Sequence, residues 1–236
     1  MAAERRQSEN VDPPYLHGEY RSTELRAPRR PLLRIEYGPT ELSGPDAGAL
    51  LGARAASGPA DDLTRQHAGE PIGERIVVHG RVLDTGRRPL PGTLIEVWQA
   101  NAAGRYAHDL DRHPAPLDPN LTGAGWCVTD ADGSYRFVTI KPGAYPWRNH
   151  PNAWRPAHIH FSVLGQSFAQ RLITQMYFPG DPLLPLDPIW RSIPSPGARE
   201  RLVASFDPGR TEPEWALAYR FDLVLSGRSN ESGGAR

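Results

Sequence analysis

From residue 74 onward, the chain alternates short apolar segments with turn-forming residues. The apolar segments are rich in Val, Ile, Tyr and Phe, which favour extended backbone, and they cover residues 75–83, 93–100, 134–140, 157–164, 171–178 and 215–225. Turn chemistry separates them, as at 130–133 (Asp-Ala-Asp-Gly), where glycine is free to adopt a positive φ. We therefore predict an all-β fold, a β-sandwich of mostly antiparallel strands with long loops.

One short helix is predicted within this β pattern, from Ala198 to Phe206. Ser195 can cap its first turn, Pro196 suits a position at the start of a helix, and the apolar residues near its end fall on one side.

The first seventy residues have a different character. Proline and glycine recur with little periodicity, so we predict an extended arm rather than a domain. Its apolar residues favour packing against the body or against another chain: Leu32, Leu33, Ile35, Tyr37 and Leu42. The predicted organisation is an arm at 1–70, a β-sandwich domain at 71–228 and a flexible tail at 229–236.

Composition narrows the range of partners and compartments. The 236 residues carry 27 basic and 27 acidic side chains with no net charge, which argues against nucleic acid or an anionic membrane as the main partner. The single cysteine, Cys127, excludes an intrachain disulfide framework, and the N-terminal residues MAAERRQSEN show no apolar secretory segment. We expect a cytoplasmic protein.

His158 and His160 form the most distinctive local pattern in the chain. They are separated by one residue inside an apolar segment that favours a strand, so their imidazoles project from the same face. This spacing suits a metal site, although an isolated pair of this kind is more often structural.

Two tyrosines add to the histidine pair. Tyr106 follows the segment 93–100, and Tyr145 opens the loop that leads to His158. Both are expected at strand ends or in loops, where binding groups are commonly carried by a rigid sheet. Either tyrosine alone would be read as a core or rim residue, but the combination with two histidines indicates a metal site.

These motifs carry a resemblance to a known family. The segments GRYAH, IKPGAYPWRNHPNAWRPAHIHF and TQMYFPGDPL are together similar to the intradiol ring-cleaving dioxygenases, and the similarity extends from LRAP to FDLVL. The resemblance implies one non-haem ferric ion per site, held by Tyr106, Tyr145, His158 and His160. It also implies that Tyr145 and His160 are the axial ligands.

The same resemblance assigns further residues around the metal. Arg155 would lie beside the substrate ring and, with Tyr145, take part in catalysis. The substrate-binding positions would be Tyr20, Trp147, Gln175 and Ile189, with Tyr20 reaching in from the arm. Trp126 departs from the family pattern, in which a smaller or basic residue is expected, and this departure affects only local packing.

The donor types also favour ferric iron on physical grounds. A trivalent cation stabilises a phenolate enough to deprotonate a phenol, whose pKa is near 10 in water. Zinc usually takes His, Cys and carboxylate ligands, and copper is less suited to this set. An Fe(II) site with two histidines and a carboxylate from Asp109 or Asp111 remains an alternative at this stage.

Some members of the family are built from two homologous chains, one of which binds the iron. The resemblance is strongest to these iron-binding chains. It implies intradiol cleavage of protocatechuate by O₂ to 3-carboxy-cis,cis-muconate, in the β-ketoadipate pathway of aromatic catabolism, and a homologous α chain as partner in a hetero-oligomer. Catechol or hydroxyquinol 1,2-cleavage is the alternative, but such enzymes carry an N-terminal helical domain, whereas this arm is proline-rich. A non-catalytic transthyretin-like binding module is a further alternative.

Overall fold

The computed structural model describes residues 12–30, 60–165 and 171–225. Its longer strands are β1 (Arg75–Asp84), β2 (Leu94–Gln99), β3 (Ala124–Val128), β4 (Ser134–Ile140), β7 (His158–Leu164), β8 (Arg171–Tyr177), β10 (Leu217–Arg220) and β11 (Leu223–Leu225). Every apolar segment of the sequence pattern forms a strand, and the last one divides into β10 and β11. The predicted all-β fold is confirmed.

The strands form two main sheets. In the first, β1 pairs antiparallel with β4 along its length, while β10 and β11 pair parallel with its two halves, and the two-residue strand β9 (Ser205–Phe206) pairs with β10. The second sheet has the order β3-β2-β7-β8 and is antiparallel throughout. Most pairings are thus antiparallel, as expected.

The core fills the space between the two sheets. Alternate residues of β7, Ile159, Phe161 and Val163, are fully buried in it, and Phe161 lies 5.9 Å, between ring centroids, from Phe137 of β4. The intervening residues of β7, including His158 and His160, therefore point to the opposite face of the second sheet. This alternation places the two histidines outside the core.

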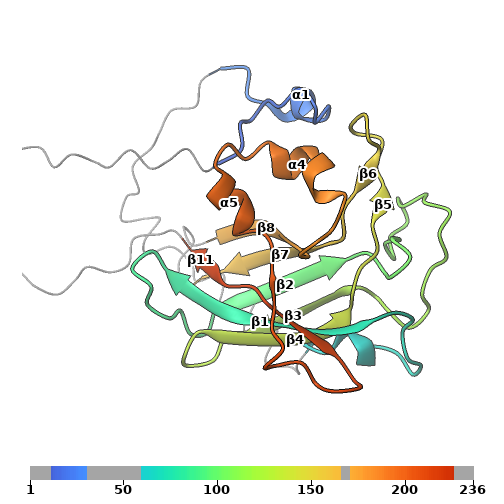
Figure 1. Cartoon of the computed structure of the whole chain (residues 1–236), viewed down its shortest axis with the longest axis vertical. Coiled ribbons are helices and arrows are strands. Elements are labelled where there is room, and N and C mark those ends of the chain that lie inside the picture. Colours follow the sequence, from blue (N-terminus) through green and yellow to red (C-terminus); the bar gives the residue numbers. More distant parts are fainter. Residues whose placement is uncertain (1–11, 31–59, 166–170, 226–236) are drawn as a thin grey trace, which may run out of the picture.

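Short helices lie outside the second sheet. Figure 1 shows α4 (Pro188–Arg191) and α5 (Pro196–Glu200) above β7 and β8, with α1 (Thr23–Arg26) beyond α4. Two 3₁₀ turns, η1 (Leu63–Arg65) and η2 (Leu184–Leu186), are the other helical elements of the described ranges. None of the helices in the described ranges is long and apolar enough to cross a membrane.

The helix predicted from Ala198 to Phe206 is shorter than expected. The Ser195 side chain caps it as predicted, accepting from the Ala198 N–H, but the helix ends at Glu200. Beyond it, the chain is drawn into sheet pairing, since Val203 bridges to Tyr177 and Phe206 pairs with β10. Long-range backbone pairing prevails there over local helical periodicity. The expectation of a single helix is also wrong, because α1 and α4 are helical.

Two contacts join described parts of the predicted arm to the body, and the packing of the arm as a whole on the body and on a partner stays a prediction. Leu63 is fully buried in the core, and the backbone N–H of Ser22 donates to the Asn149 side chain at 2.8 Å. Leu32, Leu33, Ile35, Tyr37 and Leu42 lie outside the described residues, as does the tail at 229–236. The proposed domain boundaries remain predictions.

Candidate metal centre

Three separate parts of the chain supply the predicted ligands. His158 and His160 lie on β7, Tyr106 lies in the loop that follows β2, and Tyr145 begins the two-residue strand β5 (Tyr145–Pro146). β5 pairs with β6 (Trp154–Arg155), and this hairpin leads directly into β7. The sheet thus fixes the histidines, and two loops bring the tyrosines to them.

Local hydrogen bonds shape the loop that carries Tyr106. The Asn101 side chain accepts from the N–H groups of Ala103 and Arg105 at 3.0 and 2.9 Å, and Asp111 accepts from the Tyr106 N–H at 2.8 Å. Gly104 has φ +79°, and a Cβ there would lie 2.1 Å from the carbonyl oxygen of Ala144. Glycine is therefore required where this loop meets the residue before Tyr145.

The four predicted ligand side chains converge. The Tyr106 hydroxyl lies 3.2 Å from His160 Nε2, and the Tyr145 hydroxyl lies 3.4 Å from His158 Nε2. The two phenol rings meet edge to face with centroids 5.5 Å apart, and the two imidazole centroids are 4.8 Å apart. The structure thus brings together the residues that the sequence selected, each phenol oxygen beside one imidazole nitrogen.

The surroundings of the imidazoles prepare them to bind a cation. His158 Nδ1 lies 2.7 Å from the Pro156 carbonyl oxygen, which can only accept, so Nδ1 carries the proton and Nε2 keeps its lone pair. The His160 ring stacks on Trp98 of β2 at 4.8 Å, with an interplanar angle of 2°. These contacts fix the orientation of both rings.

Burial controls the protonation of the four groups. It is the largest cause that lowers the pKa of His160 to about 4 and that of His158 well below its ordinary value, with Arg155 adding to both. Burial also raises the pKa values of Tyr106 and Tyr145. Near neutral pH, the protein alone therefore presents two neutral imidazoles and two protonated phenols. A strongly charged cation would be needed to remove the phenol protons.

This donor set fits ferric iron better than the alternatives. Two phenol oxygens and two imidazole nitrogens are hard or intermediate donors, as a trivalent ion prefers. Within the described ranges, no group of three or more His, Cys, Asp or Glu residues is placed to hold a metal. Asp109 is exposed, and Asp111 accepts from two backbone N–H groups instead. The site with two histidines and a carboxylate is therefore not formed by these residues.

Arg155 lies beside the ligands in a buried polar network. It pairs with Tyr145 across the β5–β6 hairpin, and its guanidinium forms an ion pair with Asp187, with Nε 3.1 Å from Oδ1. Nη2 also donates to Gln175 Oε1 at 2.5 Å and to the Tyr177 hydroxyl at 3.2 Å. The structure thus places Arg155 next to a predicted ligand and also gives it a carboxylate partner.

The predicted pocket residues surround this network. Arg155 lies over the Trp147 ring at 5.2 Å, and the Tyr20 ring meets Trp147 edge-on at 5.1 Å. Gln175 on β8 is the cross-strand partner of His160, and Ile189 lies on α4. All the predicted positions are thus near the centre, including the arm tyrosine, while their contacts with a substrate remain predictions.

Sequence reasoning missed three residues that support the centre: Trp98, Tyr177 and Asp187. Trp98 and Tyr177 could have been found once the strands were aligned, since they are the cross-strand partners of His160 and His158. Asp187 is separated from Arg155 by 32 residues, and no local pattern connects them.

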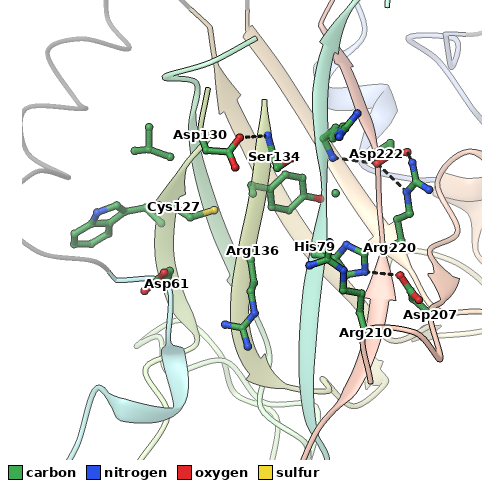
Figure 2. A pocket seen from close by; sticks show the side chains of 15 residues that line it. Asp61, His79, Cys127, Asp130, Ser134, Arg136, Asp207, Arg210, Arg220 and Asp222 are labelled. Atoms are coloured by element: carbon green, nitrogen blue, oxygen red, sulfur yellow. Dashed lines mark hydrogen bonds and ion pairs between the residues drawn. The ribbon is translucent and has the colours of Figure 1, made fainter. Parts of the chain in front are cut away.

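A second polar region lies away from the centre, on the first sheet and the nearby strand β3 of the second sheet. It is a groove of about 960 Å³ lined by residues of β1, β3, β4 and β10 and by Asp207, Arg210 and Asp222. Figure 2 shows His79 beside Asp207 and Arg220 beside Asp222, on the side of the groove opposite Asp61 and Cys127. Trp126, the departure from the family pattern, lines this groove with its indole Nε1 buried and lacking a described hydrogen-bond partner.

Comparisons with known proteins agree with this geometry. Residues 47–227 match the family model described as Dioxygenase, and residues 5–37 match the model described as Protocatechuate 3,4-dioxygenase beta subunit N terminal.

Individual relatives with similar sequences or structures are also named as dioxygenases. The chain is 57% identical over 219 residues to the protocatechuate 3,4-dioxygenase beta chain of Burkholderia cepacia, covering 92% of this chain and 91% of that one. It is 36% identical to hydroxyquinol 1,2-dioxygenase of Rhizobium sp. (strain MTP-10005), covering 57% and 45%. The crystal structure of 3-chlorocatechol 1,2-dioxygenase from Rhodococcus opacus 1CP matches with TM-score 0.53 and 25% identity, covering 71% of this chain and 65% of that one.

Proposed function

Because this chain belongs to the intradiol ring-cleavage dioxygenase family, we propose that it cleaves protocatechuate (3,4-dihydroxybenzoate) with O₂ to give 3-carboxy-cis,cis-muconate, in aromatic catabolism. The observation that carries the proposal is the convergence of two phenols and two imidazoles beside a buried arginine. The 57% identity to a relative named for protocatechuate favours this substrate over catechol or hydroxyquinol.

Tyr106, Tyr145, His158 and His160 would hold one ferric ion per site. When bound, this ion supplies the chemistry of chelating both oxygens of a diol and making the ring electron-rich toward O₂. The chain contributes neutral imidazoles, since burial lowers the pKa of His160 to about 4, and phenols whose oxygens already lie beside them. The assignment of Tyr145 and His160 as ligands follows the family resemblance and is supported by their place in this cluster.

Tyr145 would act as a base during substrate binding. A diol that binds through both oxygens must lose two protons: the Tyr145 phenolate would accept one at Oη, and a hydroxide displaced by the diol would accept the other and depart as water. Because the dianion would replace one phenolate charge and one hydroxide charge, no net charge would be added to a buried site. The β5–β6 hairpin, paired at 145–146 with 154–155 and by the Trp147 N–H that donates to the Ala153 carbonyl, carries Tyr145 on a small element outside the two main sheets.

Arg155 would stabilise negative charge that develops near the ring during the reaction. Its guanidinium is 2% exposed, and it also opposes the effect of burial on the pKa of Tyr145. A cation held in a water-poor site acts more strongly on developing charge than one in water. Trp147 and Tyr20 would pack beside the substrate and exclude water.

We further propose that the working enzyme contains a homologous α chain. The described arm residues Tyr15, Leu16 and Leu25 are 65, 58 and 91% exposed, more apolar surface than a solvated segment needs. Co-expression with an α chain should therefore yield a hetero-oligomer with more iron and more activity than this chain expressed alone. Full protocatechuate cleavage by the homogeneous single chain would contradict the need for a partner but not the iron assignment.

A cytoplasmic location is part of the proposal. Cys127 is the single cysteine of the sequence, and burial raises the pKa of its thiol to about 12, so it is poorly reactive. A chain without disulfides suits a reducing compartment.

One oxygen-uptake assay with three substrates tests the activity. We expect uptake with protocatechuate well above that with catechol or hydroxyquinol, with a carboxymuconate as product. A preference for catechol or hydroxyquinol would shift the substrate assignment within the family. A colourless, iron-free protein that takes up no oxygen with any of the three, even after incubation with iron and a homologous α chain, would instead favour a non-catalytic binding module.

A further inference from the structure

Asp187 is a fully buried carboxylate outside the set of residues assigned so far. It precedes α4 and is 0% exposed. Its two oxygens face the guanidinium of Arg155, with Oδ1 3.1 Å from Nε and Oδ2 3.2 Å from Nη2. The Nη2 contact is a hydrogen bond, whereas Nε lies within ion-pair distance of Oδ1 without a described hydrogen-bond partner, so the carboxylate holds the guanidinium by its charge and by one hydrogen bond.

Tyr177 and Gln175 complete a closed network around this contact. The Tyr177 hydroxyl lies 2.9 Å from Asp187 Oδ2 and 2.9 Å from Gln175 Oε1, and it accepts from Arg155 Nη2 at 3.2 Å. Tyr177 is itself fully buried, and its ring packs 6.0 Å from that of His158. The network therefore lies directly behind a predicted ligand.

Asp187 also ties this network to the pocket helix. Its Oδ1 accepts from the Ile189 N–H at 3.2 Å, which caps the first turn of α4. One carboxylate thus connects the helix that carries a predicted substrate-contacting residue to the arginine proposed to act on the ring. A shift of either element would disturb the other.

The charge balance explains why a carboxylate is needed there. A buried guanidinium without a counter-charge is costly, and it would move toward the nearest anion. The nearest candidates besides Asp187 would be the phenolate of Tyr145 or the bound diol. Opposing charge from Asp187 holds Arg155 at a fixed distance from both.

We propose that Asp187 is a positioning residue of the ring-cleavage reaction, which acts by fixing Arg155 against the metal centre and by linking α4 to it. This inference rests on the proposed function, because it concerns the step in which Arg155 stabilises developing charge. Asp187 acts through Arg155 and does not itself reach the reacting atoms.

The test is a double-mutant cycle with Asp187→Asn and Arg155→Gln in the iron-loaded holoenzyme. The asparagine keeps the size of the side chain and an oxygen for the Ile189 N–H, but removes the charge. We expect Asp187→Asn to keep iron and the visible tyrosinate absorption, to lower kcat by about 10- to 100-fold, and to change KM less. Added to Arg155→Gln, it should change kcat by less than about twofold, because the residue through which it acts is already gone.

A second readout does not depend on iron or turnover. In the iron-free protein, Asp187→Asn leaves Arg155 as an unpaired buried charge, so the double variant should unfold at a higher temperature than Asp187→Asn alone. Ser195→Ala is the matched control, since it removes the cap of the neighbouring helix α5 and should leave kcat unchanged.

The outcomes separate the two proposals. A kcat within about twofold of wild type for Asp187→Asn, or effects on kcat that multiply independently in the double variant, would overturn the positioning role while leaving the proposed function intact. If wild type, loaded with iron and combined with a homologous α chain, takes up no oxygen with protocatechuate, the proposed function fails first. The unfolding temperatures would then still show whether Asp187 and Arg155 are coupled.

Discussion

The metal centre and the groove lined by β1, β3, β4 and β10 are both collections of polar side chains, but they differ in which groups lie together. In the groove, groups of opposite character lie beside each other: Arg220 forms an ion pair with Asp222 at 2.7 Å, and the His79 ring lies 3.0 Å from Asp207. In the centre, two phenols and two imidazoles converge without a carboxylate among them.

This difference indicates which of the two polar regions is suited to bind a cation. Groups that satisfy each other form a stable surface and need no ligand. Groups that converge with lone pairs in a buried place are stabilised by a bound cation. A volume of about 960 Å³ therefore does not by itself mark the groove as the functional site, because the centre carries the converging donors.

Replacing one histidine in the metal centre and one in the groove should produce the largest difference in iron content and activity. His160→Ala removes a predicted ligand, so iron affinity should fall by more than the roughly 10- to 100-fold typical of losing an outer partner, and activity should be lost. His79→Ala in the groove should keep both iron and activity. Metal analysis and the visible absorption of both purified variants measure this.

Trp147→Ala is the control within the centre, and it should keep its iron. Equal iron content in His160→Ala and wild type would refute the ligand assignment.

Replacing an arginine in each region gives the next largest contrast. Arg155→Ser should keep the metal but slow oxygen consumption by about 100-fold, which is typical for deleting a preorganised group that stabilises charge. Arg210→Ser, in the groove, should consume oxygen at the wild-type rate. Normal turnover of Arg155→Ser at saturating substrate and oxygen would leave Arg155 with a structural role alone.

Much of the fold could be predicted because its strands are locally encoded. The apolar alternation of β1, β2, β4, β7 and β8 reflects burial on one face, so it is visible in the sequence. β3 was missed because Gly125 interrupts its pattern. That glycine is needed because a Cβ would lie 2.5 Å from the carbonyl oxygen of Ala60, a contact that only the tertiary structure creates.

The residues of the metal centre also fall into those that the sequence reveals and those that it does not. The histidine pair is visible because a strand imposes its spacing, whereas the tyrosines became interpretable through the family resemblance. Asp187 was invisible because α4 is positioned by tertiary packing. A single aspartate followed by proline carries no sign that it will meet Arg155.

A smaller effect is expected when the pH is lowered: the free energy of unfolding should fall because buried histidines resist protonation. Burial lowers the pKa values of His79 and His150 in the folded protein below the ordinary 6.5. Well above pH 6.5, at about pH 7.5 and higher, both are neutral whether folded or unfolded, and they do not affect the free energy of unfolding. As the pH falls below this value, the unfolded chain binds protons first, so stability declines until the folded pKa values are reached.

Unfolding of the iron-free protein at several pH values between about 7.5 and 4.5 measures this decline, over the range in which histidine titrates. His150→Phe should reduce the slope, because His150 is 4% exposed and its Nε2 has no described hydrogen-bond partner. An unchanged slope would show that His150 does not contribute to the acid sensitivity.

The smallest effect is expected for the ion pair between Arg220 and Asp222 in the groove. Its side chains are 56 and 36% exposed, so solvent and salt screen the pair, and Arg220→Ala should lower the free energy of unfolding by only about 0.5 kcal/mol. The pair between Arg155 and Asp187 has a similar geometry but is 3 and 0% exposed, and breaking it by Arg155→Gln should cost about 3–5 kcal/mol. Urea unfolding of both variants, with and without about 0.5 M NaCl, measures the difference and its salt dependence. Equal losses would mean that burial does not separate the two regions, and the contrast between matched surface charges and a buried centre would have to be abandoned.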